Sequence, residues 1–324
     1  MQRLLVKFLL VALLGAVLSP PKAQAQNYPT RVIRFVVPFP AGGVADVTAR
    51  LTGQKLGEAL GQQIVIENRP GASGTLGVDA VVKAPPDGYT LLFTTGDFIT
   101  TPTLMPAMAF DPNKDLIPIA MVATAPVLMV ANAAAPFGSV KELIAAAKAS
   151  PGTIAYSSPG TGTINHIAAE WVGIEAGVKF LHVPYRGGAP AATGIAAGDV
   201  PFGMVTPSSG QALLDAGKIK VLAVLSGQRP SFAPTWPTVA EAGLPIDAAL
   251  WVALFAPAGT PPAIVTRLND AVGRLLEDAT VRKRLNDLGT EAAPMSQAAF
   301  IARIRTDAAR YSKIIEQTGI RIER

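Results

Sequence analysis

The stretch VIRFVVPFPAGGVADVTARLTGQKLGEAL, residues 32–60, decides the fold class of this chain. Val32 to Pro38 is a short, largely β-branched run, which is typical of a buried strand. The Gly- and Pro-rich turn from Pro38 to Gly43 interrupts this run, and the pattern from Val44 to Leu60 predicts a helix. A strand, a Gly-rich turn and a helix in that order form the repeating unit of an α/β sheet.

The same order recurs along the chain. Ile64 to Glu67 and Thr90 to Thr95 read as further strands of this first series, and a second series starts at the strand Val127 to Ala131. The helix Ser139 to Ala149 opens with an S-x-x-E capping box. Strands that alternate with helices predict mostly parallel sheets with helices on their faces. Further strands of the second series are expected at Thr153 to Tyr156, Lys179 to Val183, Val200 to Val205 and Ile219 to Leu225.

The C-terminal part changes character. Trp251 to Ala256 reads as one more strand, and Thr260 as N-cap with Pro261 at the first helical position starts a helix. Ser296 begins a last helix. These helices need a sheet to pack on, and the first α/β unit supplies it if the strand at Trp251 crosses back. Two crossings give two hinged domains, and we expect residues 26–124 with 253–324 in the first and residues 125–252 in the second.

The first 25 residues have the layout of a secretory signal peptide. Arg3 and Lys7 charge its start, Leu9 to Leu18 is apolar, and Ala23-Gln24-Ala25 is an A-x-A site that predicts cleavage before Gln26. The apolar run is shorter than the roughly 20 residues of a membrane span. An uncleaved anchor is the alternative. We therefore expect a mature chain that is secreted to the periplasm.

Charge and composition exclude several classes of protein. The chain has 28 basic and 23 acidic residues, and three of the basic residues fall in residues 1–25. The mature part is thus nearly neutral and has no Lys/Arg cluster that would indicate nucleic-acid binding. The absence of cysteine excludes zinc–thiolate sites and cysteine nucleophiles. A charged fraction of 16% with abundant apolar residues argues against disorder.

Four Gly-rich turns lie directly after predicted strands and before predicted helices. They are Pro38 to Asp46, Asn68 to Gly77, Pro159 to Thr163 and Tyr185 to Pro190. Such turns lie at the carboxyl ends of strands, where α/β sheets bind ligands. The first amides of each helix are unpaired and the helix dipole favours negative charge there. Glycine in a tight loop is the alternative for any single turn, whereas four together favour a cleft that binds an anion from two sides.

Catalytic and cofactor motifs are sparse. Gly160 to Asn165 lacks the third glycine of a dinucleotide fingerprint, and no phosphate loop or G-x-S-x-G elbow is present. The two histidines are His166, in a first helical turn where it could line a cleft, and His182, inside a strand and more typical of a structural residue. They make a poor metal site without a carboxylate cluster. We expect no catalytic residue, metal or cofactor.

A few other side chains near the turns have two interpretations each. Arg186 could pair with an anionic ligand or lie on the surface. Tyr185, Phe39 and Trp251 could wall a pocket or pack in the core. Asp46 follows the first turn and is favoured there by the helix dipole rather than as an acid catalyst.

Seven motifs, in order along the chain, carry a family resemblance: Tyr28-Pro29; Val36-Val37-Pro38-Phe39 with Gly42-Gly43 and Asp46; Glu67-Asn68-Arg69-Pro70-Gly71-Ala72; Pro86-Asp87-Gly88-Tyr89-Thr90-Leu91; His182-Val183-Pro184-Tyr185; Pro237-Thr238-Val239-Ala240-Glu241-Ala242-Gly243; and Ala256-Pro257-Ala258-Gly259-Thr260-Pro261. From Tyr28 to the C-terminus the chain resembles the substrate-binding proteins of tripartite tricarboxylate transporters, also called the Bug family. The resemblance implies a fold like that of type II periplasmic binding proteins, with two α/β domains around a ligand cleft and crossover hinge strands. It also implies a monomeric receptor that delivers a small carboxylate to membrane permease subunits, or presents it to a sensor kinase.

The resemblance also implies the binding residues. In the family, backbone amides of two first-domain turns hold a ligand carboxylate, often through waters, and second-domain turns complete the cleft. The residues expected to bind ligand here are Phe39, Ala41, Gly42, Gly43, Val44, Asp46, Gly71, Ala72, Ser73, Gly74, Thr95, Gly160, Thr161, Gly162, Thr163, His166, Tyr185, Arg186, Gly187, Gly188 and Thr206.

Two departures from the family pattern bear on the ligand. Val44 stands where the family often has Ser or Thr, which removes a hydroxyl contact. Asp97, in the segment Thr94 to Phe98, is unfavourable near an anion unless it faces away or meets a ligand amine. Di- and tricarboxylates, acidic amino acids and aromatic carboxylates all remain open as ligands. The alternatives to transport are a ligand-presenting partner of a sensor kinase and an enzyme acting on a small carboxylate.

Overall fold

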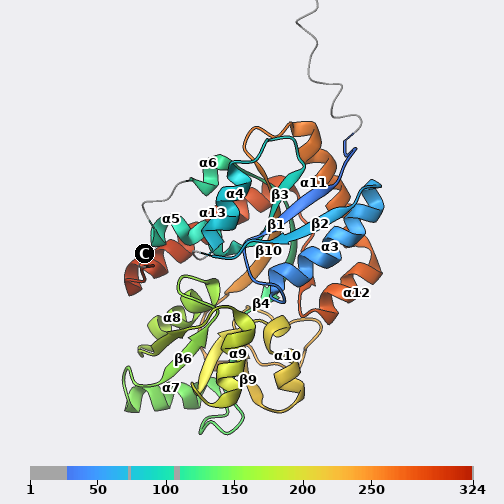
Figure 1. Ribbon diagram of the computed structural model, residues 1–324. Helices are drawn as coiled ribbons and strands as arrows, with labels where there is room; N and C mark the ends of the chain where they lie inside the picture. Colours follow the sequence, from blue (N-terminus) through green and yellow to red (C-terminus); the bar gives the residue numbers. More distant parts are fainter. Residues whose placement is uncertain (1–27, 72–73, 106–109, 323–324) are drawn as a thin grey trace, which may run out of the picture.

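The protein is described by a computed structural model that covers residues 28–71, 74–105 and 110–322. It has two α/β lobes, one above the other in Figure 1, and each is built on its own sheet. The expected α/β class is therefore confirmed. The predicted signal peptide, residues 1–25, lies outside the described residues.

The first lobe contains the sheet of order β11-β4-β10-β3-β1-β2. Its strands are β1 (Ile33–Val37), β2 (Ile64–Asn68), β3 (Thr90–Thr95), β4 (Leu116–Pro126), β10 (Ala249–Pro257) and β11 (Glu291–Ala292). Its helices are α3 (Val44–Leu60), α4 (Thr75–Val82), η2 (Gly96–Thr100), α5 (Thr101–Leu104), α6 (Pro112–Asp115), α11 (Pro262–Glu277), α12 (Ala279–Asp287) and α13 (Gln297–Thr318).

The second lobe contains the sheet of order β7-β6-β8-β5-β9. Its strands are β5 (Leu128–Asn132), β6 (Ala155–Ser158), β7 (Leu181–Pro184), β8 (Phe202–Val205) and β9 (Ile219–Val224). Its helices are α7 (Val140–Ala149), α8 (Ile164–Ala176), α9 (Gly188–Ala197) and α10 (Pro207–Asp215), and the short helix η3 (Ala240–Ala242) follows β9.

Both sheets are mixed, so the expectation of mostly parallel sheets is wrong. In the first sheet β1 pairs in parallel with β2 and β3, whereas β10 pairs antiparallel with β3 and β4. In the second sheet β6 is parallel to β7 and β8, whereas β5 is antiparallel to β8 and β9. In the first sheet the reason is the path of the chain: β4 leaves the first lobe and β10 returns to it, so the two strands run side by side in opposite directions.

The strand β4 was not expected from the sequence, and it forms the connection between the lobes together with β10. β4 ends at Pro126 and β5 of the other sheet begins at Leu128, while the return strand β10 starts at Ala249, paired with Pro126. The crossing strand expected at Trp251 lies within β10. The expected domain boundaries, after residues 124 and 252, fall inside these two strands and stay a prediction.

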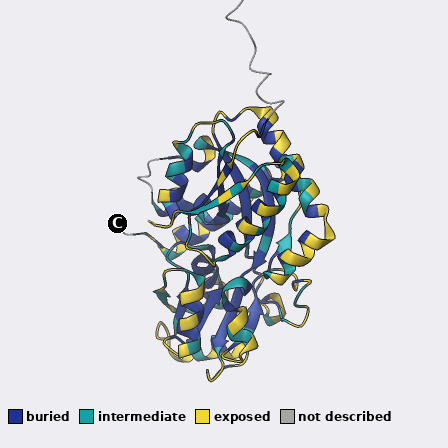
Figure 2. Ribbon diagram, turned by 45° about the vertical axis from the view of Figure 1, so that its right-hand side comes forward, coloured by how far each residue is buried: buried dark blue, intermediate teal, exposed yellow. Residues whose placement is uncertain are grey.

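The alternation of side chains along β1 explains the layers of the first lobe. Phe35 and Val37 pack in the core cluster that contains residues of α3 and α11, whereas Val36 packs with residues of α4 and α13. Successive residues of a strand point to opposite faces, so a strand with helices on both faces is apolar where it is covered, as β1 is from Phe35 to Val37. Figure 2 shows the result: the central strands are buried in both lobes, whereas the edge strands β2 and β7 are partly exposed.

Two helix starts test the sequence prediction directly. Ser139 is the N-cap of α7, and its side chain accepts a hydrogen bond from the amide of Glu142, as the capping box predicts. The prediction for α11 is wrong by one residue, since the helix begins at Pro262. Thr260 instead donates its hydroxyl proton to the carbonyl of Pro257, which closes the preceding turn.

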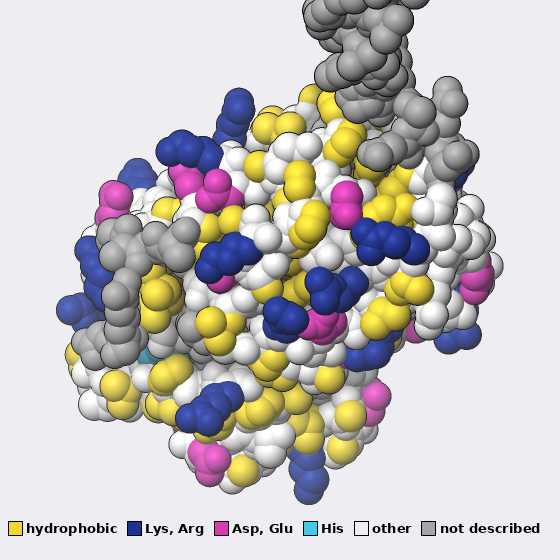
Figure 3. Space-filling model, turned by 45° about the horizontal axis from the view of Figure 1, so that its top comes forward, with side chains coloured by type: hydrophobic (Ala, Val, Ile, Leu, Met, Phe, Trp, Pro, Cys, Tyr) yellow, Lys and Arg dark blue, Asp and Glu magenta, His cyan; other side chains and the backbone are white. Residues whose placement is uncertain are grey.

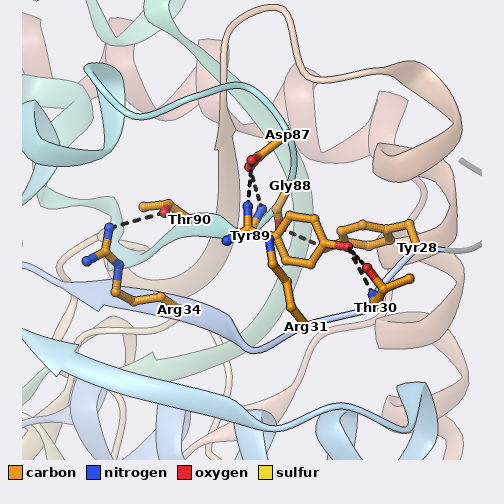
Figure 4. A network of polar contacts seen from close by, with 8 residues as sticks. All are labelled: Tyr28, Thr30, Arg31, Arg34, Asp87, Gly88, Tyr89 and Thr90. Atoms are coloured by element: carbon orange, nitrogen blue, oxygen red, sulfur yellow. Dashed lines mark hydrogen bonds and ion pairs between the residues drawn. The ribbon is translucent and has the colours of Figure 1, made fainter. Parts of the chain in front are cut away.

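Two of the family motifs anchor the start of the described chain (Figure 4). The Tyr28 hydroxyl donates to the carbonyl of Gly88 at 2.7 Å, and both rings of Tyr28 and Tyr89 pack edge to face. Arg31 lies over the Tyr89 ring at 4.0 Å and bonds to Asp87. The residues 28–31 and 87–89 are therefore structural and lie outside the expected ligand site.

The surface shows no extended field of one sign on the face drawn in Figure 3, where basic and acidic side chains are interspersed among hydrophobic and neutral ones. Ion pairs such as Arg31–Asp87 and Lys283–Asp287 are largely exposed, so each contributes less than about 1 kcal/mol. Within the described ranges, no helix is long and apolar enough to cross a membrane.

Candidate functional site

Each of the four Gly-rich turns follows a strand and precedes a helix. In the first lobe they connect β1 to α3 and β2 to α4, and in the second lobe they connect β6 to α8 and β7 to α9. Because β1 is parallel to β2 and β6 is parallel to β7, the two turns of each lobe lie at the same edge of their sheet. The structure therefore brings the expected turns together in pairs.

One turn of the second lobe touches the first lobe. A Cβ atom added to Gly162, in the turn before α8, would lie 2.6 Å from Leu104 of α5 and 3.1 Å from Ile322. Gly162 also has a φ of +79°, which favours glycine. Only a residue without a side chain allows this approach, so the second-lobe turn packs directly against the first lobe.

A buried carboxylate shapes the turn before α3. Asp46 accepts hydrogen bonds from the Gly42 amide at 2.9 Å, from Arg50 at 2.8 Å and from the Asn68 amide at 3.0 Å. Asn68 also donates to the carbonyl of Phe39 at 3.1 Å. Burial disfavours the charged Asp46, but these hydrogen bonds outweigh it and lower its pKa below the usual value. Asp46 thus holds the turn in place, as a helix-start residue rather than an acid catalyst.

The amides at the start of α3 are the donors that this cluster positions. Among the described residues, the backbone N–H groups of Gly43, Val44 and Ala45 have no hydrogen-bond partner. They lie at the N-terminus of a helix of 17 residues. Unpaired amides and the helix dipole together favour an anion at such a place.

The neighbouring turn before α4 is only partly described. The Gly74 amide donates to the carbonyl of Gly71 at 2.9 Å, so this part of the turn is closed by its own backbone. The expected binding residues Ala72 and Ser73 lie outside the described residues.

The turn before α8 differs from the turn before α3, because several of its amides have partners. Gly160 donates to the Ser158 hydroxyl at 3.2 Å, and Gly162 donates to Nδ1 of His166 at 3.0 Å. The His166 amide donates to the Thr163 hydroxyl at 3.3 Å. The expectation of unpaired amides in the first turn of each helix is therefore wrong for this residue of α8. The amides of Gly160, Gly162 and His166 thus find their partners within the second lobe.

That junction is made by Asp97 of η2. Its Oδ1 accepts a hydrogen bond of 2.6 Å from the amide of Ile164, the first residue of α8, and its Oδ2 accepts one of 2.6 Å from the Thr95 hydroxyl. Burial raises the pKa of Asp97, although both hydrogen bonds oppose this. From the sequence, Asp97 was expected to face away or to meet a ligand amine. In the structure its carboxylate lies on the N-terminus of a helix in the other lobe.

The two histidines stack against each other beneath this turn. Their ring centroids are 3.7 Å apart with an angle of 12° between the planes, and Nε2 of His182 lies 2.7 Å from the Ser158 hydroxyl. Burial, with a smaller effect of His182, lowers the pKa of His166 to about 3, and burial lowers that of His182 to about 4. Both imidazoles are therefore neutral at neutral pH. The hydrogen bonds of His182 agree with its expected structural role.

The turn before α9 carries Arg186, the cation that was predicted near the site. Arg186 is exposed, and it forms no ion pair with any residue that the structure describes. Gly187 donates its amide to the carbonyl of Pro159 at 2.9 Å, which ties this turn to the turn before α8. Tyr185 is half-buried and packs on Gly194 of α9, where an added Cβ would lie 2.3 Å from its hydroxyl.

Thr95 and Thr206 are the expected binding residues at the ends of β3 and β8. Both are buried, and the Thr206 hydroxyl lies 3.0 Å from that of Ser208. Trp251, which had two interpretations, belongs to the core: it is buried and donates its indole N–H to Asp307 at 3.1 Å.

The cavities of the molecule do not by themselves identify the site. A hollow of about 640 Å³ lies on the outer side of α3 and β2, away from all the helix starts. A cavity of about 10 Å³, room for about one water, lies at the first-lobe turns and is lined by Phe39, Gly74 and Thr94 among others. We place the site at the turns because polar groups converge there, whereas the larger hollow lies on the outside of one lobe. Among the described residues, no cluster of three or more acidic or histidine side chains could hold a metal ion.

Sequence reasoning missed two asparagines at this site. Asn68 ends β2 and holds the first turn through its amide. Asn165 is buried at 2% exposure in the first turn of α8, and its Nδ2 has no partner among the described residues. A buried polar group without a partner is uncommon. A polar residue directly at a strand end or a helix start beside a Gly-rich turn is the signal that could have found both.

Comparison with known proteins identifies the family. Residues 48–320 match the family described as the tripartite tricarboxylate transporter family receptor. The chain belongs to this family. Among relatives of this receptor, Protein BugT of Bordetella pertussis is 33% identical over 305 residues, which cover 92% of this chain and 93% of BugT.

Solved structures agree with this membership. The receptor is similar to an R. palustris protein solved with adipate, at 35% identity and a TM-score of 0.85, over 91% of this chain and 99% of that one. It is also similar to MatC from Rhodopseudomonas palustris with bound malate, at 31% identity and a TM-score of 0.81, over 89% of this chain and 100% of MatC. The receptor is therefore a solute-binding protein of two α/β domains, and not an enzyme.

Proposed function

We propose that this receptor captures a small carboxylate in the periplasm and delivers it to the membrane permease of a tripartite tricarboxylate transporter. The observation that carries the proposal is the set of amides of Gly43, Val44 and Ala45, which lack partners among the described residues at the start of α3. Two similar proteins of solved structure hold adipate and malate, both carboxylates, which supports the same ligand class here. The receptor acts as a monomer that is exported by its signal peptide.

In this proposal the two lobes have different roles. The first lobe supplies rigid amide donors, because Asp46, Arg50 and Asn68 fix the turn that carries them. The second lobe closes over the rest of the ligand with the turns before α8 and α9. His166 and Gly162 shape the first of these turns, and Arg186 is the cation of the second. Delivery to a permease rests on the family and not on any of these contacts.

Thermal stability of the mature protein, residues 26–324, tests the proposal. A ligand at 100 times its dissociation constant adds about 2.7 kcal/mol to the free energy of unfolding, which raises the melting temperature by several degrees in a chain of this size. We expect such a rise with at least one acid from a panel of mono-, di- and tricarboxylates, acidic amino acids and aromatic acids. Neutral amides of the same acids are the controls. If no acid raises the melting temperature and the denatured protein releases no small acid, the proposal is wrong.

Val44 allows a sharper test of the backbone donors. Val44 is the first residue of α3, and Gly43 before it has φ −80° and ψ 169°, a conformation compatible with a following proline. Proline is tolerated at this helix position and removes only its N–H. We expect Val44→Pro to weaken binding of the identified acid by about tenfold or more, whereas Val44→Ala, which keeps the amide, binds close to wild type. Equal affinities of the two variants would contradict the assignment of the carboxylate to α3.

A further inference from the structure

The starts of α3 and α8 lie at the same edge of the first sheet, because α3 follows β1, and Asp97, which follows the parallel strand β3, bonds to the start of α8. These two helix starts are not equivalent. The amides at the start of α3 lack partners among the described residues, whereas the Ile164 amide at the start of α8 already binds a carboxylate, that of Asp97. A helix N-terminus favours one anion, and a second anion beside it is repelled by the first. The protein therefore places a carboxylate of its own on one of these helix starts and leaves the other for the carboxylate of the ligand.

Asp97 also lacks a compensating cation. Among the described residues, no lysine or arginine forms an ion pair with it, and its hydrogen bonds come from Thr95 and Ile164. Each carboxylate oxygen has a further lone pair to accept a second hydrogen bond. The nearby Asn165 of the same helix turn offers a buried Nδ2 donor without a described partner. This end of the site thus has an anionic acceptor and a neutral donor.

We propose that Asp97 determines the specificity of the receptor: the ligand carries one carboxylate, at the start of α3, and an uncharged or cationic hydrogen-bond donor at its other end, facing Asp97. This inference rests on the proposed carboxylate-binding function and narrows it. A second carboxylate at that end is rejected, because it would stand beside the carboxylate of Asp97. The group that fits is an amide, a hydroxyl or an ammonium.

Affinities for matched acids test the proposal. Each set contains three acids of one carbon-chain length, whose distal group is a carboxylate, an amide or an amine. The shortest set is succinate, succinamate and 4-aminobutanoate, and the longest is adipate, its monoamide and 6-aminohexanoate. In the set that fits best, the mature wild-type protein should bind the monoamide or the amine about tenfold or more tightly than the diacid. Asp97→Asn keeps the shape and an oxygen for the Ile164 amide but removes the charge. It should reduce that ratio by about tenfold or more, with the diacid gaining affinity.

Asp287→Asn, on the exposed face of α12, is the control for the change in net charge, and its ratio should equal that of the wild type. The role of Asp97 would be overturned if diacids bind the wild type as tightly as their monoamides and the ratio of the two affinities is unchanged in Asp97→Asn. The proposed carboxylate-binding function would still hold in that case. Equal loss of all three ligands in a folded Asp97→Asn would overturn the role of Asp97 too, since Asp97 would then support the site as a whole. If neither protein binds any acid, the proposed function itself is wrong.

Discussion

Acidification from pH 7 to pH 5 is expected to lower the free energy of unfolding through the stacked pair His166 and His182. In the folded protein both imidazoles are held neutral, because burial lowers their pKa values to about 3 and about 4. In the unfolded chain both have the ordinary value of about 6.5. The unfolded state therefore binds more protons throughout this range, and stability falls as the pH falls.

The size of the effect follows from the two pKa values. Between pH 7 and pH 5, one imidazole that titrates near 6.5 only in the unfolded chain costs the folded state about 2 kcal/mol. Solvent screening reduces the share of His182, which is partly exposed. We therefore expect about 3 kcal/mol for the pair. The stabilisation is fully present above pH 6.5 and is lost progressively below it, until the folded state binds the protons as well near pH 4.

Urea denaturation of the mature protein at pH 7, 6 and 5, followed by tryptophan fluorescence, measures this loss. Carboxyl groups also titrate in part of this range, among them Glu170, whose pKa burial raises. The comparison with His182→Phe removes their contribution, because this variant keeps a ring for the stack and the same carboxyl groups. Its loss between pH 7 and pH 5 should be smaller than that of the wild type by about 1–2 kcal/mol.

Equal losses in the wild type and in His182→Phe would refute the reasoning. They would mean that His182 accepts its proton in the folded state as easily as in the unfolded chain. A second variant, His166→Phe, should show the larger difference of the two, since His166 is the more deeply buried ring and has the lower pKa.

Two further substitutions test the packing of the first lobe. Asp46→Ala removes the hydrogen-bond acceptor of the turn before α3, so its donors lose their partner. We expect the free energy of unfolding, measured by urea denaturation, to fall by about 1–3 kcal/mol, and the identified acid to bind more weakly in calorimetry. An unchanged affinity would mean that Asp46 does not support the binding site. Gly88→Ala would place a Cβ 2.6 Å from Ile264 and 2.9 Å from Tyr28 at a φ of +81°. We expect it to lower the melting temperature clearly more than Gly217→Ala, a position with φ +64° and open space, since only the former adds a clash to the backbone strain.

Local structure was predictable from the sequence wherever Gly and Pro mark the ends of an element. The helix Val44–Leu60 and the strand Thr90–Thr95 have the expected bounds. The strand β4 (Leu116–Pro126) was missed, and the directions of the sheets were wrong. Strand direction in a sheet depends on which distant segment lies alongside, here β10, and no local pattern of residues encodes that pairing.

The candidate site was predictable as a set of turns but not as a set of donors. The turn sequences place amides at helix starts, and this holds at Val44. Whether an amide is free depends on side chains that fold next to it. Ile164 takes its partner from Asp97, 67 residues away in the sequence and in the other lobe. The sequence therefore showed that Asp97 is unusual at this place, but only the structure shows which group it contacts.

The place of β10 in the first sheet has a consequence for the order in which the molecule folds. β10 lies between β4 and β3, so a chain that has emerged only as far as residue 248 has the two parts of that sheet without the strand that joins them. The second sheet, by contrast, takes all its strands from residues 128–224. Because the chain is synthesised from its N-terminus, the second lobe can complete its sheet first, although its sequence is inserted into the sequence of the first lobe. The lobe that begins the chain is the last to be finished, and α3 gains its packing against α11 only when the C-terminal segment has arrived.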